Sequence, residues 1–259
     1  MDLHLNGKTA MVCGARTGLG HACAAALAAE GVALTLLSRD AAGLAAAAAG
    51  LAGTHGVPVR PVAGDLADPA ARAALIAACP APDILILNAG GPPPGDATRF
   101  AEADWTAALA AGVAAQISLV NAVLPGMRAR RFGRIVVISS GALKAPLPFL
   151  ALSNAARAGL WSALKGLSRQ VAAEGVTINA LLPHAFETDR LASNFANRAR
   201  QSDADAGQLR AASLAAIPAG RFGQPEEFAI MCATLCHARL GYLTGQAILL
   251  DGGHFTGVL

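Results

Sequence analysis

The sequence has little charge, few aromatic residues and no cysteine framework. Only 14% of its 259 residues are charged and 4% are aromatic, whereas 54% are hydrophobic. Such an apolar chain is not intrinsically disordered. Its five cysteines form no Cys-x-x-Cys pair, which is typical of a reducing compartment. Cys232, Cys236 and His237 are better explained by a helix with two buried thiols than by a metal site. We therefore expect a cytoplasmic protein without a metal.

The charge that is present makes the chain mildly basic. The formal net charge is +3, and lysine and arginine are scattered, which does not indicate a nucleic-acid-binding protein. The one dense group comprises Arg128, Arg130, Arg131 and Arg134. We interpret this group as a solvated helix end before a strand. No nucleic-acid partner is expected.

One long stretch raises the question of a membrane. The chain begins Met-Asp-Leu-His, without the basic and apolar regions of a signal peptide. From Trp105 to Met127 it carries no charge over a length that would cross a bilayer. Gln116, Asn121 and Pro125 interrupt this stretch, which is otherwise rich in alanine. We interpret it as a helix in a core or a subunit interface, and we expect no membrane partner.

Short apolar runs alternate with alanine-rich stretches along the whole chain. The predicted strands are Thr9–Cys13, Val32–Leu37, Val57–Val62, Asp83–Leu87, Arg134–Ser139, Val176–Leu182 and Ala247–Leu250. The predicted helices include Leu19–Glu30, Ala41–Gly53, Pro69–Ala78 and Asn154–Glu174. Strands that alternate with helices, and that are apolar throughout, predict an α/β fold with a parallel sheet covered on both faces.

The chain has no evident internal boundary. No linker rich in serine, glycine and proline divides it, so we expect one dinucleotide-binding domain over residues 1–259. The most polar segment is Asn194–Arg210. We interpret residues 194–215 as a flexible, mostly helical insertion that forms a lid over a ligand.

A glycine-rich turn follows the first predicted strand. Gly14, Gly18 and Gly20 stand between that strand and the first predicted helix. Glycines in this position allow a tight turn and the close approach of a pyrophosphate to the amides of the helix N-terminus. The spacing is weak evidence alone, but its place after the first strand strengthens the prediction of a dinucleotide site.

These glycines are the first of several motifs that follow a known order. Gly64-Asp65-Leu66, Asn88-Ala89-Gly90, Gly133-Arg134-Ile135-Val136 and Ser139-Ser140 come next. Arg221 to Glu227 and Thr244 to Gly253 complete the series near the end of the chain. In this order and spacing the sequence resembles the short-chain dehydrogenase/reductase family over essentially its whole length. It is most similar to a divergent branch resembling 3-oxoacyl-carrier-protein reductases.

The resemblance implies a Rossmann-type, doubly wound parallel sheet of about seven strands with helices on both faces. It also implies a nicotinamide cofactor. The end of the second strand carries Ser38-Arg39, where a carboxylate would select NAD, and Arg16 adds positive charge nearby. We therefore favour NADP(H) over NAD(H), the alternative being a solvent-exposed Arg39 and a site that accepts either. The predicted cofactor-binding residues are Gly14, Arg16, Thr17, Gly18, Leu19, Gly20, Ser38, Arg39, Asp65, Leu66, Asn88, Ala89, Gly90, Arg157, Pro183 and Thr188.

The catalytic pattern of the family is altered. The resemblance implies a catalytic Asn, Ser, Tyr and Lys, and Ser140 occupies the serine position. The other three positions hold Gly112, Ser153 and Arg157, and the one tyrosine, Tyr242, lies far along the chain. A serine hydroxyl is a much weaker acid than a tyrosine phenol, and an arginine keeps its charge without shuttling protons.

Two other residues could supply the missing proton. Lys144 lies in the loop after Ser140, and a desolvated lysine titrates near neutrality. His184 follows Pro183 beside the expected nicotinamide position, and histidine suits proton transfer near pH 7. The alternatives are a solvent-facing lysine and a packed, hydrogen-bonded histidine. A water bound to Ser153 is the third candidate. We thus predict Ser140, Lys144, Ser153, Arg157 and His184 as the catalytic set.

Three functions remain open at this point. The first is an NADP(H)-dependent oxidoreductase acting on a ketone or secondary alcohol, hydrophobic according to the apolar loop Ala145–Leu150. The second is a catalytically inactive subunit that supports an active paralogue. The third is a lyase or isomerase acting on a β-keto compound. The resemblance implies a homodimer or homotetramer, with a non-identical family member as another possible partner.

Overall fold

The structure, a computed structural model, describes residues 2–202 and 205–258, which form one seven-stranded parallel sheet. The strands are β1 (Thr9–Cys13), β2 (Ala33–Ser38), β3 (Val59–Ala63), β4 (Ile84–Leu87), β5 (Gly133–Ile138), β6 (Val176–Pro183) and β7 (Ala247–Leu250). Their order across the sheet is β3-β2-β1-β4-β5-β6-β7, and every pairing is parallel. The predicted α/β fold with a doubly wound parallel sheet is confirmed, and each predicted strand lies within two residues of an observed one.

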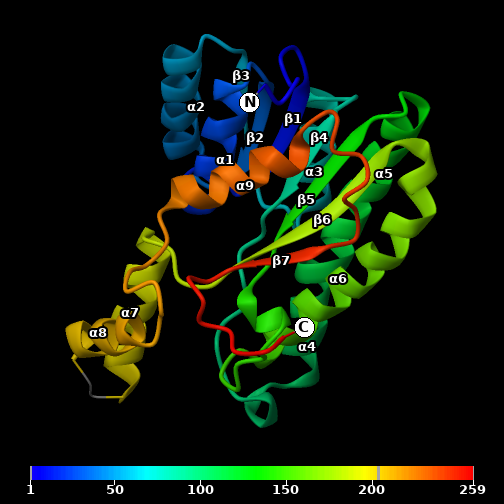
Figure 1. Ribbon diagram of the computed structural model, residues 1–259. Helices are drawn as coiled ribbons and strands as arrows, with labels where there is room; N and C mark the ends of the chain where they lie inside the picture. Colours follow the sequence, from blue (N-terminus) through cyan, green and yellow to red (C-terminus); the bar gives the residue numbers. More distant parts are fainter. Residues whose placement is uncertain (1, 203–204, 259) are drawn as a thin grey trace.

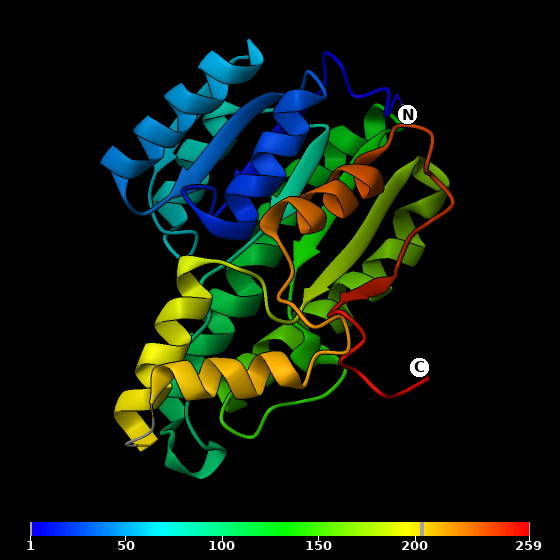
Figure 2. The same cartoon turned by 60° about the vertical axis from the view of Figure 1, so that its left-hand side comes forward.

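Helices cover both faces of this sheet (Figures 1 and 2). The helices up to the middle of the chain are α1 (Gly18–Ala29), α2 (Ala41–His55), α3 (Pro69–Ala78), α4 (Glu102–Leu109) and α5 (Ala115–Ala129). The later ones are α6 (Ala151–Val171), α7 (Asp189–Ser202), α8 (Ala206–Ala215) and α9 (Pro225–Cys236). Short 3-10 turns occur at η1 (Ala97–Arg99), η3 (Gly141–Leu143) and η4 (Ala172–Glu174), and η2 (Ala110–Ala114) is a π-helical turn.

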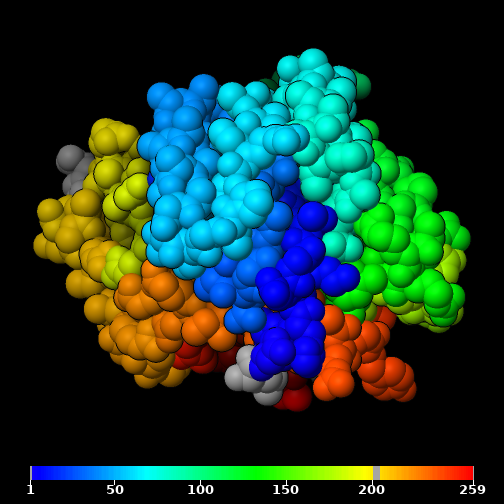
Figure 3. Space-filling view, turned by 90° about the horizontal axis from the view of Figure 1, so that it is seen from above, coloured from blue at the N-terminus to red at the C-terminus, as the bar shows by residue number. Residues whose placement is uncertain are grey.

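Two buried clusters form the core, one on each face of the sheet. On one face, α1, α2 and α9 pack on β1, β2 and β4. On the other face, α3, α5 and α6 pack on β1, β4, β5 and β6. Seen from above in Figure 3, the blue and cyan N-terminal part of the chain lies between the yellow and orange C-terminal segments and the green middle. The first cluster likewise joins α1, near the start of the chain, to α9, near its end.

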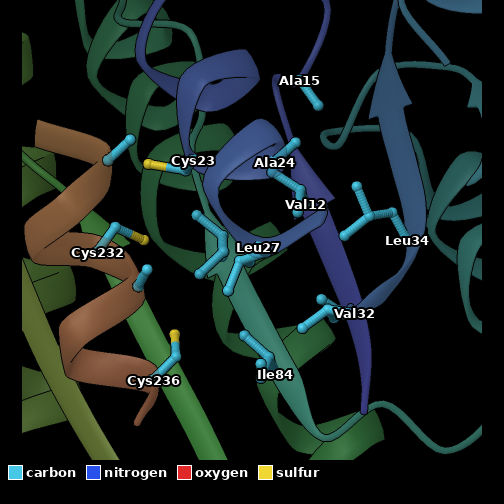
Figure 4. Close-up of a cluster of buried hydrophobic side chains, with 14 of the residues drawn as sticks. Val12, Ala15, Cys23, Ala24, Leu27, Val32, Leu34, Ile84, Cys232 and Cys236 are labelled. Atoms are coloured by element: carbon cyan, nitrogen blue, oxygen red, sulfur yellow. The ribbon is translucent and has the colours of Figure 1, made fainter. Parts of the chain in front are cut away.

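The thiols belong to this core. Figure 4 shows Cys23 on α1 facing Cys232 and Cys236 on α9 across the first cluster. All three are buried and unpaired as disulfides, which confirms the prediction of a helix carrying two buried thiols. A hydrogen bond with a neighbouring thiol (Cys23 for Cys232, and Cys232 for Cys236) and then burial raise the pKa of Cys232 and Cys236. These groups therefore stay protonated, as packing residues do.

The dense arginine group is only partly solvated. Arg128 pairs with Glu174, and Arg130 lies 3.5 Å from Asp83. Arg134, in contrast, is 2% exposed, so the prediction of a solvated helix end is wrong at this position. Its guanidinium donates to the carbonyl oxygens of His237 and Ala238, beyond α9. It thus ties the start of β5 to a distant loop, because buried charges require several hydrogen-bond partners.

The two edge strands are less buried than predicted, and β7 is only partly buried along its whole length. The sequence indicates apolar strands covered on both faces, and β4, β5 and most of β6 are buried. In β3, however, Arg60, Pro61 and Ala63 are exposed. This exposure follows from the strand order: β3 lies at the edge of the sheet with β2 as its one neighbouring strand, so the rest of the protein covers less of its surface.

The uncharged stretch forms a helical segment from Glu102 to Ala129. By length and composition this segment could cross a membrane, and 39% of its most apolar window is buried inside the protein. Leu119, Val120, Val123 and Met127 on α5 pack into the second cluster. The face of α5 that carries these four residues is therefore part of the protein core, as the sequence interpretation expects.

The predicted lid, residues 194–215, corresponds to most of α7 and to α8. These two helices project from the end of the sheet and are yellow in Figure 1. Phe195 of α7 packs against Ile217 and Phe222 in a small cluster separate from the two main ones. Residues 203 and 204 lie outside the described residues. The role of the segment as a lid stays a prediction.

Candidate active site

The glycine loop joins β1 to α1 in a backbone shape that side chains would block. Gly14 and Gly18 have φ angles of +61° and +62°, a region that favours glycine. A Cβ on Gly20 would overlap the carbonyl oxygen of Gly14 and would lie 2.7 Å from Asn88 Nδ2. Asn88 Nδ2 donates to that carbonyl at 3.2 Å. The loop therefore closes on the end of β4.

The N-terminus of α1 is left open by this loop. Thr17 is the N-cap residue, and in the described part of the chain its side chain makes no capping hydrogen bond. The first amides of α1 are thus available to an anion, which the helix dipole also favours. A Cβ on Gly18 would lie 3.5 Å from the methyl group of Thr188, so α7 begins directly over the loop. Leu19 packs against the first cluster and anchors the turn. These residues fit the pyrophosphate of a dinucleotide.

Two arginines flank the end of β2, and each lies near a carboxylate. Arg16 Nε is 3.6 Å from Asp40 Oδ2, and Arg39 Nη1 is 4.0 Å from Asp65 Oδ2. The sequence reasoning considered only the absence of an acid at Ser38-Arg39 and missed the position of Asp40. That carboxylate also accepts from the amide of Gly43 at 3.1 Å and so caps α2. The side chain of Arg39 is 80% exposed, which leaves it free to meet a phosphate.

The other predicted cofactor residues lie where strands end. Ser38 ends β2, and Asp65 follows β3, where its Oδ1 accepts from the amide of Ala67 at 2.9 Å. Leu66 is buried in the second cluster. Ala89 and Gly90 follow β4 and line a small cavity. Because carboxyl ends of parallel strands share one edge, these residues lie along the same side of the sheet as the glycine loop.

Ser153 and Arg157 meet one helical turn apart on α6. Arg157 Nε donates to Ser153 Oγ at 3.1 Å, and Arg157 Nη1 donates to the carbonyl of Ile138 at 3.4 Å. Both side chains line the cavity that contains Ala89 and Gly90. Burial, and second the positive charge of Arg190, lower the pKa of Arg157 to about 10. The guanidinium is therefore still charged at neutral pH, and it fixes the serine hydroxyl beside the cavity.

The position of the family's asparagine is closed by packing. Gly112 lies in the π-helical turn η2, and a Cβ there would lie 2.7 Å from the Cβ of Ala156. Gln116, which is 5% exposed, donates from Nε2 to the carbonyl of Gly112 at 2.8 Å and also lines the cavity. Sequence reasoning missed Gln116, although its place one turn after Gly112 was a usable signal.

Ser140 and Lys144 lie on the loop after β5. Ser140 Oγ accepts from the amide of Ala142 at 3.2 Å, and the hydroxyl thereby caps η3. Lys144 ends this turn with an exposed side chain. The lining of the cavity includes Ser139 and Ser153 but, among the described residues, neither Ser140 nor Lys144.

His184 lies at the end of β6, away from the cavity of Ser153. Its amide donates to the carbonyl of Leu250, and its ring stacks on His254 with centroids 4.1 Å apart. Partial burial and then the nearby His254 lower the pKa of His184, while Asp251 opposes this shift. Pro183, the preceding residue, is the last of β6. The structure thus brings together Ser153 and Arg157 but not His184.

Arg190 is a second residue that sequence reasoning missed. It lies in the first turn of α7, and its Nη2 is 2.9 Å from the point that a Cβ on Gly91 would occupy. Gly91 lines the same cavity as Arg157. The only sequence signal was its place two residues after Thr188, a predicted cofactor contact.

Comparisons with known proteins cover the whole of this arrangement. A family model described as enoyl-(acyl carrier protein) reductase matches residues 14–254. A 3-oxoacyl-[acyl-carrier-protein] reductase from Vibrio cholerae is 31% identical over 257 residues, which are 98% of this chain and 99% of that protein. The NADPH-dependent reductase BacG from Bacillus subtilis is 30% identical over 251 residues, or 95% and 97% of the two chains.

A solved structure shows the same overall arrangement. L-sorbose reductase from Gluconobacter frateurii, complexed with NADPH and L-sorbose, matches with a TM-score of 0.92 and 30% identity. The match covers 100% of both chains. The similarity therefore extends over the glycine loop, the cavity on α6 and the segment that contains α7 and α8.

Proposed function

This chain belongs to the short-chain dehydrogenase/reductase family of oxidoreductases, and we propose that it transfers hydride between NADP(H) and a ketone or secondary alcohol through an altered active site. The observation that carries the proposal is a glycine loop of the family's form facing the same sheet edge as a charged Ser153–Arg157 pair. A reductase needs both a place for the dinucleotide and an ordered polar group near the reacting oxygen.

The choice of NADP(H) rests on Arg16 and Arg39. An adenosine 2′-phosphate at the end of β2 would meet two guanidinium groups, of which Arg39 is the more exposed. Asp40 and Asp65 would be held by these arginines rather than facing the phosphate. The names of BacG and of the L-sorbose reductase complex, which specify NADPH, support the same choice.

The chain's own residues have separable roles in the proposed reaction. When bound, the cofactor supplies the hydride that reduces the carbonyl carbon. Ser153 Oγ, held by Arg157, orients a water that relays a proton from bulk solvent to the carbonyl oxygen, so that the water itself is regenerated. Arg157 stays protonated and stabilises the negative charge that develops on that oxygen, because a preformed charge in a water-poor site is effective there. In the reverse direction the alcohol proton leaves through the same water.

A cofactor titration tests this proposal. NADPH binding to the purified protein, followed by nicotinamide fluorescence, is expected to be at least about tenfold tighter than NADH binding, because only NADPH brings the 2′-phosphate. In the Arg39→Gln variant the dissociation constant for NADPH should rise by about tenfold, while that for NADH stays unchanged. Arg60→Gln on the neighbouring strand β3 removes the same charge and is the matched control.

Either of two results would contradict the proposal. Equal affinities for the two cofactors would remove the argument from Arg39. Failure of both cofactors to bind would leave the second candidate, a catalytically inactive subunit that supports an active paralogue. The serine in place of the family's tyrosine favours that candidate, and co-purification with a related chain would support it.

We also infer a homo-oligomer in the cytoplasm that acts on a small carbonyl compound. Leu109 at the end of α4 and Leu147 and Phe149 before α6 are exposed apolar side chains, at 42%, 38% and 46%. Leu109 lies within the uncharged stretch Trp105–Met127, which the sequence indicates as a helix in a core or a subunit interface. Light scattering coupled to size-exclusion chromatography tests this inference, and a monomer at micromolar concentration would contradict it.

A further inference from the structure

Two guanidinium groups converge at one cavity from different parts of the fold. Arg157 reaches it from α6, and Arg190 reaches its edge from the first turn of α7. Arg190 Nη2 lies beside Gly91, which has no side chain to separate it from the cavity. Electrostatic repulsion from Arg190 adds to the effect of burial in lowering the pKa of Arg157. Two positive charges therefore approach one small space.

No carboxylate of the described residues pairs with either guanidinium group. The hydrogen bonds of Arg157 go to neutral acceptors, Ser153 Oγ and the carbonyl of Ile138. An arginine carries five N–H donors, so most donors of the two side chains stay available. Arg157 is the buried member of the two, and a buried charge without a charged partner is energetically costly, whereas Arg190 is exposed and its charge is solvated.

The rest of the cavity is neutral and sterically open on the side of Gly91. Gly90, Gly91 and Pro92 form one wall, and Gln116 and Leu160 contribute to the other. Such a setting strengthens any charge-assisted hydrogen bond formed inside it. A planar carboxylate matches the fork of a guanidinium, which makes it the anion that fits best.

We propose that the substrate carries a carboxylate, which binds between Arg157 and Arg190 beside Ser153. The substrate class is then an oxoacid, or the matching hydroxyacid in the reverse direction. This inference rests on the proposed function for the reaction, but the carboxylate site itself is built only from residues of this chain. It adds a charged group to the otherwise apolar substrate that the sequence predicts.

The phosphates of the cofactor are another source of the same anionic chemistry. Thr188 lies next to Gly18, so Arg190 is only two residues from the pyrophosphate position. Arg157, however, lines a cavity formed by residues after β4, by η2, by β5 and by α5 and α6, and none of the described glycine-loop residues Gly14–Gly20 contributes to it. The cavity at Arg157 is therefore separate from the phosphate-binding turn, so an anion bound there is not the pyrophosphate, although Ala89 and Gly90 in its lining are predicted cofactor contacts.

Matched acids and amides test the proposal on the cofactor-loaded protein. Pyruvate, acetoacetate and levulinate are titrated by calorimetry into protein loaded with NADP⁺, which prevents turnover, and each is compared with its amide. The pairs have nearly the same shape and differ in charge. At least one acid is expected to bind about tenfold or more tightly than its amide, as charge-assisted bonds to two arginines imply.

Variants locate the effect. Arg190 is exposed, so the Arg190→Gln variant should fold normally. The ratio of acid affinity to amide affinity should fall by about tenfold in this variant, while the NADP⁺ dissociation constant stays unchanged. Arg157→Lys keeps a charge and should retain part of the preference. Arg169→Gln, an exposed arginine on α6 three turns from Arg157, removes the same charge and should change nothing.

Each other outcome overturns the inference. Acids that bind no better than amides would exclude a carboxylate site. If Arg190→Gln weakened NADP⁺ binding and left the acid preference intact, the anion would belong to the cofactor. The titrations are repeated without cofactor, so that a failure of the proposed function, seen as no NADPH binding, is distinguished from a failure of the carboxylate site.

Discussion

The glycine loop before α1 and the catalytic turn of α6 lie along one sheet edge but differ in how closely they follow the family. The loop keeps Gly14, Gly18 and Gly20, whereas α6 carries Ser153 and Arg157 where the family has tyrosine and lysine. The glycines are required by the backbone and by Asn88, whatever the reaction. Ser153 and Arg157 line a cavity, so packing constrains their side chains less tightly than the glycine loop is constrained. The fold therefore constrains the glycine loop more tightly than it constrains the residues that line the cavity.

The altered residues are mutually consistent. Ser153 accepts a hydrogen bond from Arg157. Ala156, on the same helix α6, packs against Gly112 of η2, where a larger residue would collide with it. Gln116 then takes the carbonyl of Gly112 as its partner. Among the described residues, Asn154 Oδ1 on α6 is buried without a hydrogen-bond partner, whereas the hydroxyl of Ser153 and the amide nitrogen of Gln116 have partners. Variants in the two regions can separate structural from chemical constraint.

The largest effect is expected in the glycine loop. Gly20→Ala would place a methyl group against the Gly14 carbonyl and 2.7 Å from Asn88 Nδ2, both held in place. We expect a loss of about 1–3 kcal/mol in the free energy of unfolding, as for other overpacked sites, and a loss of NADPH binding. Urea denaturation and fluorescence titration measure the two effects.

Gly53→Ala is the matched control for that change. It lies within α2, and a Cβ there has no neighbour within 4 Å in the described structure. It should stabilise the protein by about 0.5–1 kcal/mol through helix propensity and leave NADPH binding unchanged. A Gly20→Ala protein as stable as the wild type would show that the loop is not constrained by packing.

In the catalytic region the effect should fall on turnover instead. Ser153→Ala removes the hydroxyl that orients the proton-delivering water, and we expect kcat/KM to fall by about 10²–10⁴-fold. NADPH binding should be unchanged, because the glycine loop is untouched. Steady-state kinetics with the substrate found by the acid–amide titrations measures the effect.

Ser168→Ala separates catalysis from packing. Ser168 is also a buried serine on α6, and its hydroxyl donates to the carbonyl of Lys165 at 2.8 Å. Its loss should cost about 1 kcal/mol of stability without changing kcat/KM. If Ser153→Ala retained full turnover, the proton would come from another group, and Lys144→Ala and His184→Ala would identify it.

The sequence predicts the sheet and the glycine turn after β1 well, for physical reasons. Apolar runs and glycine turns are local patterns, and strands such as Thr9–Cys13 follow from them directly. The burial of Arg134 depends on carbonyls about a hundred residues away, and no local pattern contains them. The exposure of β3 likewise depends on strand order, which only the assembled sheet determines.

The contacts of the predicted catalytic residues are also of two kinds, local and distant in sequence. Ser153 and Arg157 can be paired from sequence because i and i+4 residues share a helix face. The approach of Arg190 to Gly91, and the stacking of His184 on His254, join segments far apart along the chain. Spacing cannot predict such contacts. The hypothesis that Lys144 or His184 supplies a proton therefore depended on residue type and on position along the chain, and it stays untested.

The smallest effect concerns pH and the histidine pair at the end of β6. Burial and His254 lower the pKa of His184 in the folded state, so the unfolded chain binds this proton first. Stability linked to His184 is therefore present above the unfolded pKa and is lost as pH falls through the folded pKa. Denaturation between pH 7.5 and 5 should show a smaller loss for His184→Gln than for wild type. His254→Gln should give an intermediate loss, because burial still acts on His184. Identical pH profiles for all three proteins would show that the stacked pair does not titrate with folding.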